Sequence, residues 1–272
     1  EGLIAIYDGA ADGMFSEEPR LISIGREIRN VAAADVDANG TTDLICLGHG
    51  SEDITILSGD GSGGFELVER IRLAPWKNGF VYPQSASILD VDGDDNLDLV
   101  SVSIGARSVH ISRGLGDGTL ESPKAWIAPD VNGGAGGCAY VSIGDFDSDG
   151  LYEIIAPQTT WGQQWFILFE LDASGSITSG TPVQASPFGV SWISDVADFD
   201  GDGDTDLCIG HALPGVVAFM ENVTELDGQT IFSEPQWFFI GEFIRYTYAK
   251  DLDLDGDQDL ISASCDDNTI AW

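Results

Sequence analysis

Residues 197–211 read ADFDGDGDTDLCIGH, an acidic stretch followed by a short apolar run. The same pattern occurs four more times, as ADVDANGTTDLICLG from residue 34, LDVDGDDNLDLVSVS from 89, GDFDSDGLYEIIAPQ from 144 and KDLDLDGDQDLISAS from 250. The first acids are Asp35, Asp90, Asp145, Asp198 and Asp251, so successive copies are separated by 55, 55, 53 and 53 residues. A period this regular indicates a repeat architecture.

Each repeat contains four short segments rich in β-favouring residues and bounded by Gly, Asp, Asn or Pro. Apolar and small residues lead into the acidic stretch, as in NVAAADV, and a second run such as DLICLG follows it. A third run, such as ITILSG, precedes a Gly and Asp turn and a fourth run such as ELVERIRL. No segment shows a helical periodicity of useful length. The sequence therefore predicts an all-β fold, a β-propeller of four-stranded blades in which residues 1–272 form one domain.

The chain carries 46 Asp and Glu against 11 Lys and Arg, a formal net charge of -35. Such a field repels nucleic acids and anionic membrane surfaces and attracts cations. A solvated surface suited to high salt is the alternative explanation, but the acids recur at too regular a spacing for it. No apolar run reaches the roughly 18 residues that span a bilayer, and residues 1–20 lack the pattern of a signal peptide. We therefore expect a soluble chain from which any signal has been removed.

Each acidic stretch follows the pattern D-x-D-x-[DN]-G-x-x-[DE], with oxygen-bearing side chains at positions one, three, five and nine. Ca²⁺ takes about 6–8 oxygen ligands, and alternate residues of a tight loop can turn theirs towards one centre, with a backbone carbonyl from position seven. Glycine at position six permits the sharp reversal, and the second copy departs from this with Asp95. We predict about five Ca²⁺ ions, held by Asp35, Asp37, Asn39, Thr41 and Asp43; Asp90, Asp92, Asp94, Asn96 and Asp98; Asp145, Asp147, Asp149, Leu151 and Glu153; Asp198, Asp200, Asp202, Asp204 and Asp206; and Asp251, Asp253, Asp255, Asp257 and Asp259.

The sequence resembles the FG-GAP family, also described as VCBS-type repeats, through DVDANGTTD, DVDGDDNLD, DFDSDGLYE, DFDGDGDTD and DLDLDGDQD and through downstream turns that end in Phe15, Phe65 or Phe232. That family builds the β-propeller of integrin α subunits and of a fungal lectin that binds N-acetylglucosamine. The resemblance implies calcium in the loops, and the family spans lectins, adhesion modules and the propeller parts of some lyases and dehydratases. Calcium loops of weak to moderate affinity suit the extracellular space, so we expect a secreted or cell-surface protein.

The residues at the two ends of the chain bear on the number of blades. Residues 251–272 and 1–34 together supply 22 + 34 = 56 residues, close to one period, which favours a closed five-bladed ring. However, GLIAIYDG near the N-terminus and NTIAW at the C-terminus both look like the third strand of a blade. Closure would therefore duplicate one strand, and a fragment of a seven-bladed propeller is the alternative.

A ligand is expected on the face opposite the acidic loops. Successive strands of a blade run antiparallel, so the loops between strands two and three and the connections between blades share that face, and these segments vary between repeats. Aromatic rings stack on the apolar surfaces of sugars, and the amides of Asn78, Gln84, Gln163 and Gln164 could bond hydroxyl groups. Packing of the tryptophans between blades is the alternative. We predict recognition of a carbohydrate or an extracellular protein through Trp76, Tyr82, Trp161, Trp192 and Tyr246.

No catalytic residue is predicted, because His49, His110 and His211 lie in no recognisable nucleophile or zinc motif. We therefore expect a binding module rather than an enzyme. The alternatives are a structural subunit of an extracellular assembly, in which copies pack together, and the propeller part of a polysaccharide-active lyase or dehydratase.

Two further features concern covalent chemistry. Asn222 begins the sequon Asn-Val-Thr in the turn between the third and fourth strands of its repeat, which predicts a glycosylated surface position. The cysteines show no CxxC spacing, which argues against a zinc or thioredoxin-like site and leaves the disulfide pattern open for Cys46, Cys138, Cys208 and Cys265.

Overall fold

The computed structural model describes most of the chain, namely residues 2–10, 14–25, 27–73, 81–131, 136–159, 164–186, 191–213, 215–224, 230–266 and 269–271. These residues form strands and turns and contain no helix. Nothing in this part of the chain is a helix that could cross a membrane. The all-β class predicted from the sequence is confirmed.

The strands form antiparallel sheets in strict chain order. A two-stranded ribbon consists of β1 (Gly2–Ile6) and β2 (Arg20–Gly25). The four-stranded sheets are β3 (Ile28–Ala34), β4 (Asp43–Gly48), β5 (Asp53–Gly59) and β6 (Phe65–Arg72); β7 (Pro83–Leu89), β8 (Asp98–Ser103), β9 (Ser108–Ser112) and β10 (Lys124–Ile127); β11 (Ser142–Gly144), β12 (Glu153–Pro157), β13 (Gln164–Leu171) and β14 (Ile177–Ser186); and β15 (Ser191–Ala197), β16 (Asp206–His211), β17 (Val216–Met220) and β18 (Gln236–Phe239). The last sheet has three strands, β19 (Ile244–Lys250), β20 (Asp259–Ser264) and β21 (Thr269–Ala271).

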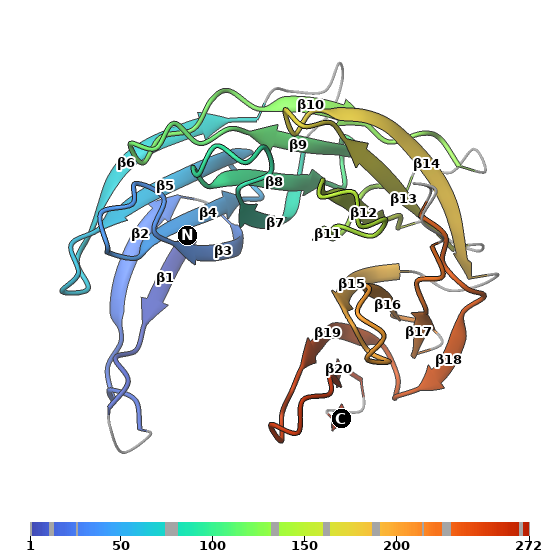
Figure 1. Ribbon diagram of the computed structural model, residues 1–272. Coiled ribbons are helices and arrows are strands. Elements are labelled where there is room, and N and C mark those ends of the chain that lie inside the picture. The colour runs from blue at the N-terminus through green and yellow to red at the C-terminus, as the bar shows by residue number, and fades with distance from the viewer. Residues whose placement is uncertain are drawn as a thin grey trace.

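The four-stranded sheets and the last, three-stranded sheet are the blades of a five-bladed β-propeller, as predicted from the five repeats. Consecutive blades pack through their first strands, with β3 against β7, β11 against β15 and β15 against β19. Figure 1 shows the blades following one another along a curve, with the ribbon β1–β2 at one end and the sheet β19–β21 at the other. The first strands therefore converge on the inside of the curve.

The two ends of the chain present the same strand of a blade, as the sequence predicted. In the second and fourth blades, an isolated bridge lies in the connection from the third to the fourth strand, Gly114 to Leu120 and Asn222 to Phe232. The connection from β1 to β2 carries the matching bridge between Gly9 and Phe15, so β1 corresponds to a third strand. Strand β21 is the third strand of the last sheet, and the two strands lie in separate sheets.

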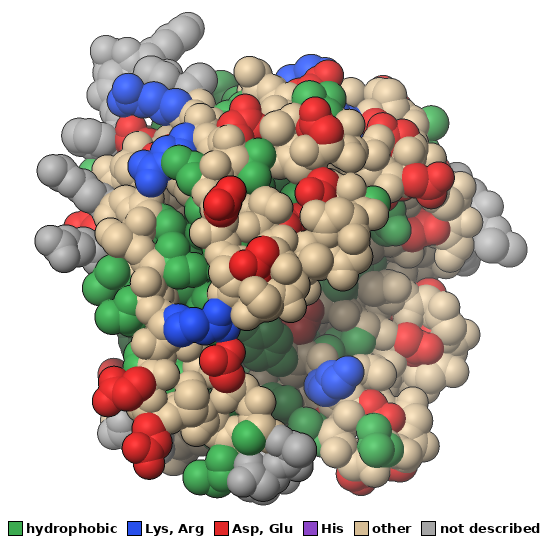
Figure 2. Space-filling model, turned by 90° about the vertical axis from the view of Figure 1, so that its left-hand side faces the viewer, with side chains coloured by type: hydrophobic (Ala, Val, Ile, Leu, Met, Phe, Trp, Pro, Cys, Tyr) green, Lys and Arg blue, Asp and Glu red, His purple; other side chains and the backbone are tan. Residues whose placement is uncertain are grey.

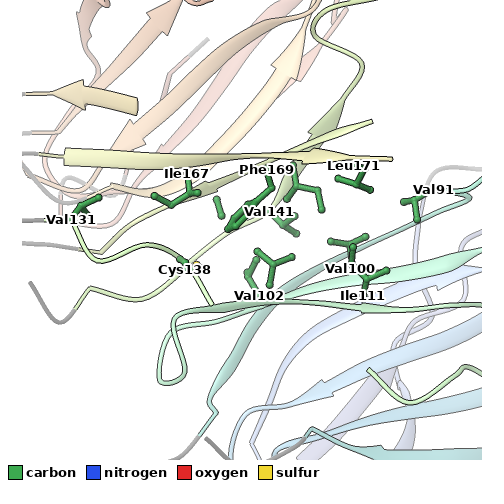
Figure 3. Close-up of a cluster of buried hydrophobic side chains, with 14 residues drawn as sticks. Val91, Val100, Val102, Ile111, Val131, Cys138, Val141, Ile167, Phe169 and Leu171 are labelled. Carbon is green, nitrogen blue, oxygen red and sulfur yellow. The ribbon is translucent and has the colours of Figure 1, made fainter. Parts of the chain in front are cut away.

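The position of a strand within its blade decides its burial. The second strands β4, β8, β12 and β16 are buried along their whole length, because neighbouring blades cover both faces. Figure 3 shows one such contact, where Val100 and Val102 of β8 face Ile167 and Phe169 of β13 across the space between two blades. By contrast, the outermost strands β10 and β18 are exposed throughout. The core is thus a series of apolar layers between blades.

Candidate functional site

The five acidic loops all lie at the same ends of the blades. They comprise residues 35–43, 90–98, 145–153, 198–206 and 251–259, and each joins the first strand of a blade to the second. Since the sheets are arranged side by side with the same orientation, the loops share one face of the propeller. Figure 2 shows acidic side chains spread widely over the side of the molecule that it presents.

The carboxylate at position one closes each loop. Asp35 Oδ2 accepts a hydrogen bond from the backbone N–H of Gly40, at position six, with an N–O distance of 2.8 Å. The same bond recurs in the other four loops at 2.9 to 3.1 Å, from Asp95, Gly150, Gly203 and Gly256. The acid at position one therefore holds the reversal of the chain as well as facing the loop centre.

The acid at position nine ties the loop to the rest of its blade. Asp43 is fully buried, and its two carboxylate oxygens accept N–H bonds from Val36 and Gly59, both at 2.9 Å. The backbone N–H of position two makes the corresponding bond in every repeat. In the second and fourth repeats the other oxygen accepts the N–H of the second residue after the third strand, Gly114 or Asn222.

Each loop also has a left-handed backbone at positions four and six. Position six has positive φ in all five loops, including Asp95 with φ 69°, so the second loop keeps the common shape despite lacking glycine there. Position four has positive φ as well, at Ala38, Gly93, Ser148, Gly201 and Leu254. The sequence pattern did not reveal this second requirement, because only two of these five residues are glycine.

The loops bring together the acids that the sequence predicted as metal ligands. Oxygens of positions one, three and nine lie within 4.8 Å of one another in the first, third and fourth loops, and those of positions one, three and five do so in the second and fifth. The role of these side chains as metal ligands stays a prediction in every loop, as does that of the carbonyl at position seven.

Several side-chain oxygens of the loops, at positions one, three and seven, have no hydrogen-bond partner among the described residues. Asp92 Oδ1, Asp145 Oδ1 and Asp204 Oδ1 are buried and accept no hydrogen bond from the described residues. Burial, with the like charges of neighbouring acids, raises the pKa of Asp204 to about 6 and that of Glu153 to about 8. Buried, mutually repelling carboxylate oxygens fit a hard divalent cation, for which oxygen is the preferred ligand.

The second loop contains a cation of its own. The guanidinium of Arg113 lies 2.9 Å from Asp98 Oδ2 and 3.5 Å from Asp92 Oδ2, at positions nine and three of the loop. Arg113 also donates to the backbone carbonyl of Ser174 in the next blade. No sequence pattern indicated this residue, since it follows the third strand and lies 15 residues after Asp98.

The opposite face of the propeller contains a cavity of about 250 Å³, here called the axial cavity. The beginnings of the first strands line it, at the ends remote from the acidic loops. Its polar lining residues are Arg29, Asn30, Gln84, Tyr140, Arg245 and Tyr246. Of these, Tyr246 was predicted as a ligand residue and Gln84 as a hydrogen-bonding amide.

The remaining predicted ligand residues are distributed as follows. Tyr82 stacks on His49, with ring centroids 4.8 Å apart, so its ring is engaged by a neighbouring loop. Trp76 and Trp161, with Asn78 and Gln163, lie outside the described residues. Trp192 lies in β15, but its side chain is outside the described part, and Gln164 is buried.

The predicted surface position of Asn222 is wrong. Its side chain is 1% exposed, and its Nδ2 donates to the carbonyls of Phe146 at 2.7 Å and Thr205 at 3.1 Å. The amide thus bridges two blades, and a glycan on Nδ2 does not fit this folded position. Within the sequon, Thr224 donates its N–H to Asn222 Oδ1 at 3.1 Å. All four cysteines are free, three of them buried.

Comparison with known proteins agrees with this architecture. The model of the FG-GAP-like repeat matches residues 35–101 and 90–156. No curated protein sequence matches the chain. Among solved structures, a lectin from Agrocybe aegerita that recognises non-reducing terminal N-acetylglucosamine is 19% identical, with a TM-score of 0.59 over 95% of this chain and 68% of the lectin.

Two further structures share the fold. BBS1N, solved in complex with ARL6DN, is 11% identical with a TM-score of 0.58, over 92% of this chain and 67% of that one. The exotype rhamnogalacturonan lyase YesX is 13% identical with a TM-score of 0.53, and the match covers 96% of this chain but 49% of the lyase. At these identities the similarity concerns the fold alone. The chain is thus a β-propeller that carries FG-GAP-like repeats.

Proposed function

We propose that the protein is a calcium-stabilised extracellular binding module that recognises carbohydrate on the face opposite its acidic loops. The observation that carries the proposal is the axial cavity, where amide, phenol and guanidinium groups gather at the strand ends remote from the loops. One face is thus occupied by five nearly identical loops, and the other offers varied side chains. Varied residues on a rigid scaffold are typical of recognition sites.

Calcium would be held by the side chains at positions one, three, five and nine of each loop, which are acids except for Asn39. A bound ion would supply positive charge where buried carboxylates otherwise repel one another. Five ions would change the formal charge from -35 to -25, since each contributes two positive charges. The chain's own part is to hold the oxygens in place through the backbone N–H bonds of positions two and six. Extracellular calcium modules work at dissociation constants of about 10⁻⁴–10⁻³ M, which suits such exposed loops.

Recognition of a sugar is supported by the fold and by the chemistry of the cavity. The lectin with the same fold binds a terminal sugar. Here, the exposed ring of Tyr246 and the amides of Asn30 and Gln84 provide a stacking surface and hydrogen-bonding groups. We assign no bond-breaking role to these residues, and binding alone is proposed.

A glycan array probed with and without a calcium chelator tests the proposal. The calcium-loaded protein should bind a defined set of glycans, release them in the chelator, and leave them uncleaved. A folded, calcium-loaded protein that binds no glycan would overturn the carbohydrate assignment. Cleavage of the bound glycans would instead indicate an enzyme.

A further inference from the structure

The axial cavity is unusual in its charge. Among its described lining residues there is no Asp or Glu, although the chain has 46 of them, while two of its 11 basic residues, Arg29 and Arg245, contribute to the lining. A positively charged cavity in so acidic a protein concentrates anions at one place and leaves the rest of the surface repellent to them.

A β-bulge places a side chain in the cavity from several blades. In β3 the register skips Arg29, in β7 it skips Gln84, and in β19 it skips Arg245, each between the first and third residues of the strand. The same skip in β15 falls on Trp192. A bulge leaves its extra residue outside the ladder and redirects its side chain, and bulges are frequent beside binding sites. The bulge residues of three blades, Arg29, Gln84 and Arg245, therefore line a common site.

A neutral amide orients Arg29. Arg29 Nε donates to Gln84 Oε1 at 3.2 Å, and no carboxylate of the described residues lies within 4.0 Å of its nitrogens. The guanidinium of Arg245 lies over the ring of Phe243, 5.5 Å from the centroid. Stacking engages the flat face of a guanidinium, whereas its N–H groups point from the edge, where a carboxylate binds.

The cavity also contains an unsatisfied acceptor. Asn30 Oδ1 is buried and has no hydrogen-bond partner among the described residues. A buried polar atom without a partner is costly, by about 1–3 kcal/mol. A hydroxyl group of a ligand would satisfy it. This requirement separates a hydroxylated ligand from a simple anion, which has no proton to donate.

Aromatic groups complete the lining. The ring of Tyr246 is 54% exposed and lies parallel to that of Tyr248, at 4° and 6.4 Å between centroids. Burial, together with the nearby Tyr248 and Asp195, raises the pKa of Tyr140, so its phenol stays a neutral donor. Asp195 lines an adjoining cavity with Tyr140, but its two oxygens accept the N–H groups of Val196 and Ala249, which disperse its negative charge.

We infer that the axial cavity binds a sugar that bears a carboxylate, such as a uronic acid residue of a glycan. Arg29 and Arg245 bind the carboxylate, Asn30 Oδ1 accepts a ring hydroxyl, and Tyr246 packs against the sugar ring. The volume of about 250 Å³ limits the site to about one monosaccharide. The inference rests on the proposed carbohydrate-binding function and specifies the class of sugar.

Methyl β-D-glucuronide and methyl β-D-glucoside test this, because they differ in a carboxylate that replaces a hydroxymethyl group. Titration calorimetry in calcium should show the glucuronide binding at least about tenfold more tightly, since bonds to charged groups are the stronger ones. The substitutions Arg29→Gln and Arg245→Gln should each reduce glucuronide affinity about tenfold. Arg72→Gln removes the same charge at the exposed end of β6 and should leave the affinity unchanged.

The charge requirement of the site is tested separately at Asn30. Asn30→Asp preserves size but adds a negative charge, so it should abolish glucuronide binding and spare calcium binding. Melting temperatures in calcium verify that each variant is folded, and if one of the three does not fold, the other two decide. Equal affinity for the two sugars, or equal behaviour of Arg29→Gln and Arg72→Gln, would overturn the inference. If the native protein binds neutral glycans on the array and shows no preference for the glucuronide, the acidic-sugar inference fails and the proposed function stands; if native protein binds no glycan, both fail.

Discussion

Arg113 forms a buried ion pair with Asp98, with 2.9 Å between Nη1 and Oδ2, inside the loop that the sequence assigns to a calcium ion. The second loop therefore balances part of its charge without metal, whereas no Lys or Arg of the described residues pairs with an acid of the other four loops. A guanidinium next to a cation site also repels an incoming ion. Its neighbour Asp92, at position three, is contacted by the same side chain at 3.5 Å.

We expect Arg113→Ser to increase calcium affinity at the second loop about tenfold, because a positive charge next to two carboxylates of the loop is removed. In chelator the same variant should be less stable by about 3–5 kcal/mol, since the carboxylates remain buried without their partner. Calorimetric stoichiometry and chemical unfolding measure the two effects. Arg107→Gln, which removes a half-exposed pair with Asp130 away from the loops, is the control. Unchanged calcium binding in Arg113→Ser would contradict this role.

Substitution at position six should report the left-handed backbone of the loops. Asp95 has φ 69°, and Asp95→Gly should stabilise the calcium-loaded protein by about 0.5–1 kcal/mol, as glycine adopts this conformation without strain. Gly150→Ala makes the opposite change at the same position of the third loop. A Cβ there meets no atom within 4 Å, so its cost of about 1–2 kcal/mol would be conformational. Equilibrium unfolding of both variants measures this, and a loss of stability in Asp95→Gly is the adverse result.

Removal of metal should destabilise the whole propeller. If calcium binds only the native state, each loop contributes about 2.7 kcal/mol at a hundredfold excess over its dissociation constant. The melting temperature should therefore fall in excess chelator and recover on addition of calcium. Magnesium, which requires nearly octahedral geometry and retains its water, should restore it less well. An identical melting temperature with and without chelator would show that the loops are stable as acidic turns.

Stability should decrease as the pH falls from 6.5 towards 4, in part because of His110. Burial lowers the pKa of His110 to about 4, with its Nε2 2.7 Å from Ser108 Oγ. In the unfolded chain this imidazole takes up a proton near the ordinary histidine pKa of 6.5, but in the folded chain it does not. The stabilisation is therefore complete above 6.5 and lost progressively below it, by at most about 3 kcal/mol. His110→Gln should flatten the profile measured in calcium, and an unchanged slope would argue against it.

The fold and the loops could be predicted because the residues that specify them lie close together in the sequence of each repeat. The acidic pattern, the glycine at position six and the β-favouring runs lie within a few residues of one another, and five copies reinforce the interpretation. The second left-handed position could not be predicted, because Ala38, Ser148 and Leu254 adopt positive φ under the constraint of the surrounding bonds. The burial of Asn222 follows from its contacts with another blade, which a sequon does not encode.

Only some of the residues that line the axial cavity could be predicted from the sequence. Tyr246 and Gln84 were predicted from residue type and loop position, but Arg29, Asn30 and Arg245 belong to no motif. They are far apart along the chain, and the convergence of the first strands brings them together. The bulges that redirect Arg29 and Arg245 likewise appear only in the pairing with the second strands.

The hydrogen bonds that the acid at position nine accepts make three backbone amides sensitive to whether an ion occupies the loop. The N–H groups of Gly59, Gly114 and Asn222 each donate to the buried carboxylate of their own repeat. An ion that draws electron density from that carboxylate must alter the chemical shift and exchange protection of the attached amide. A calcium titration followed by nuclear magnetic resonance could therefore be resolved blade by blade. The order in which the three signals move would give the ranking of affinities that a bulk measurement averages.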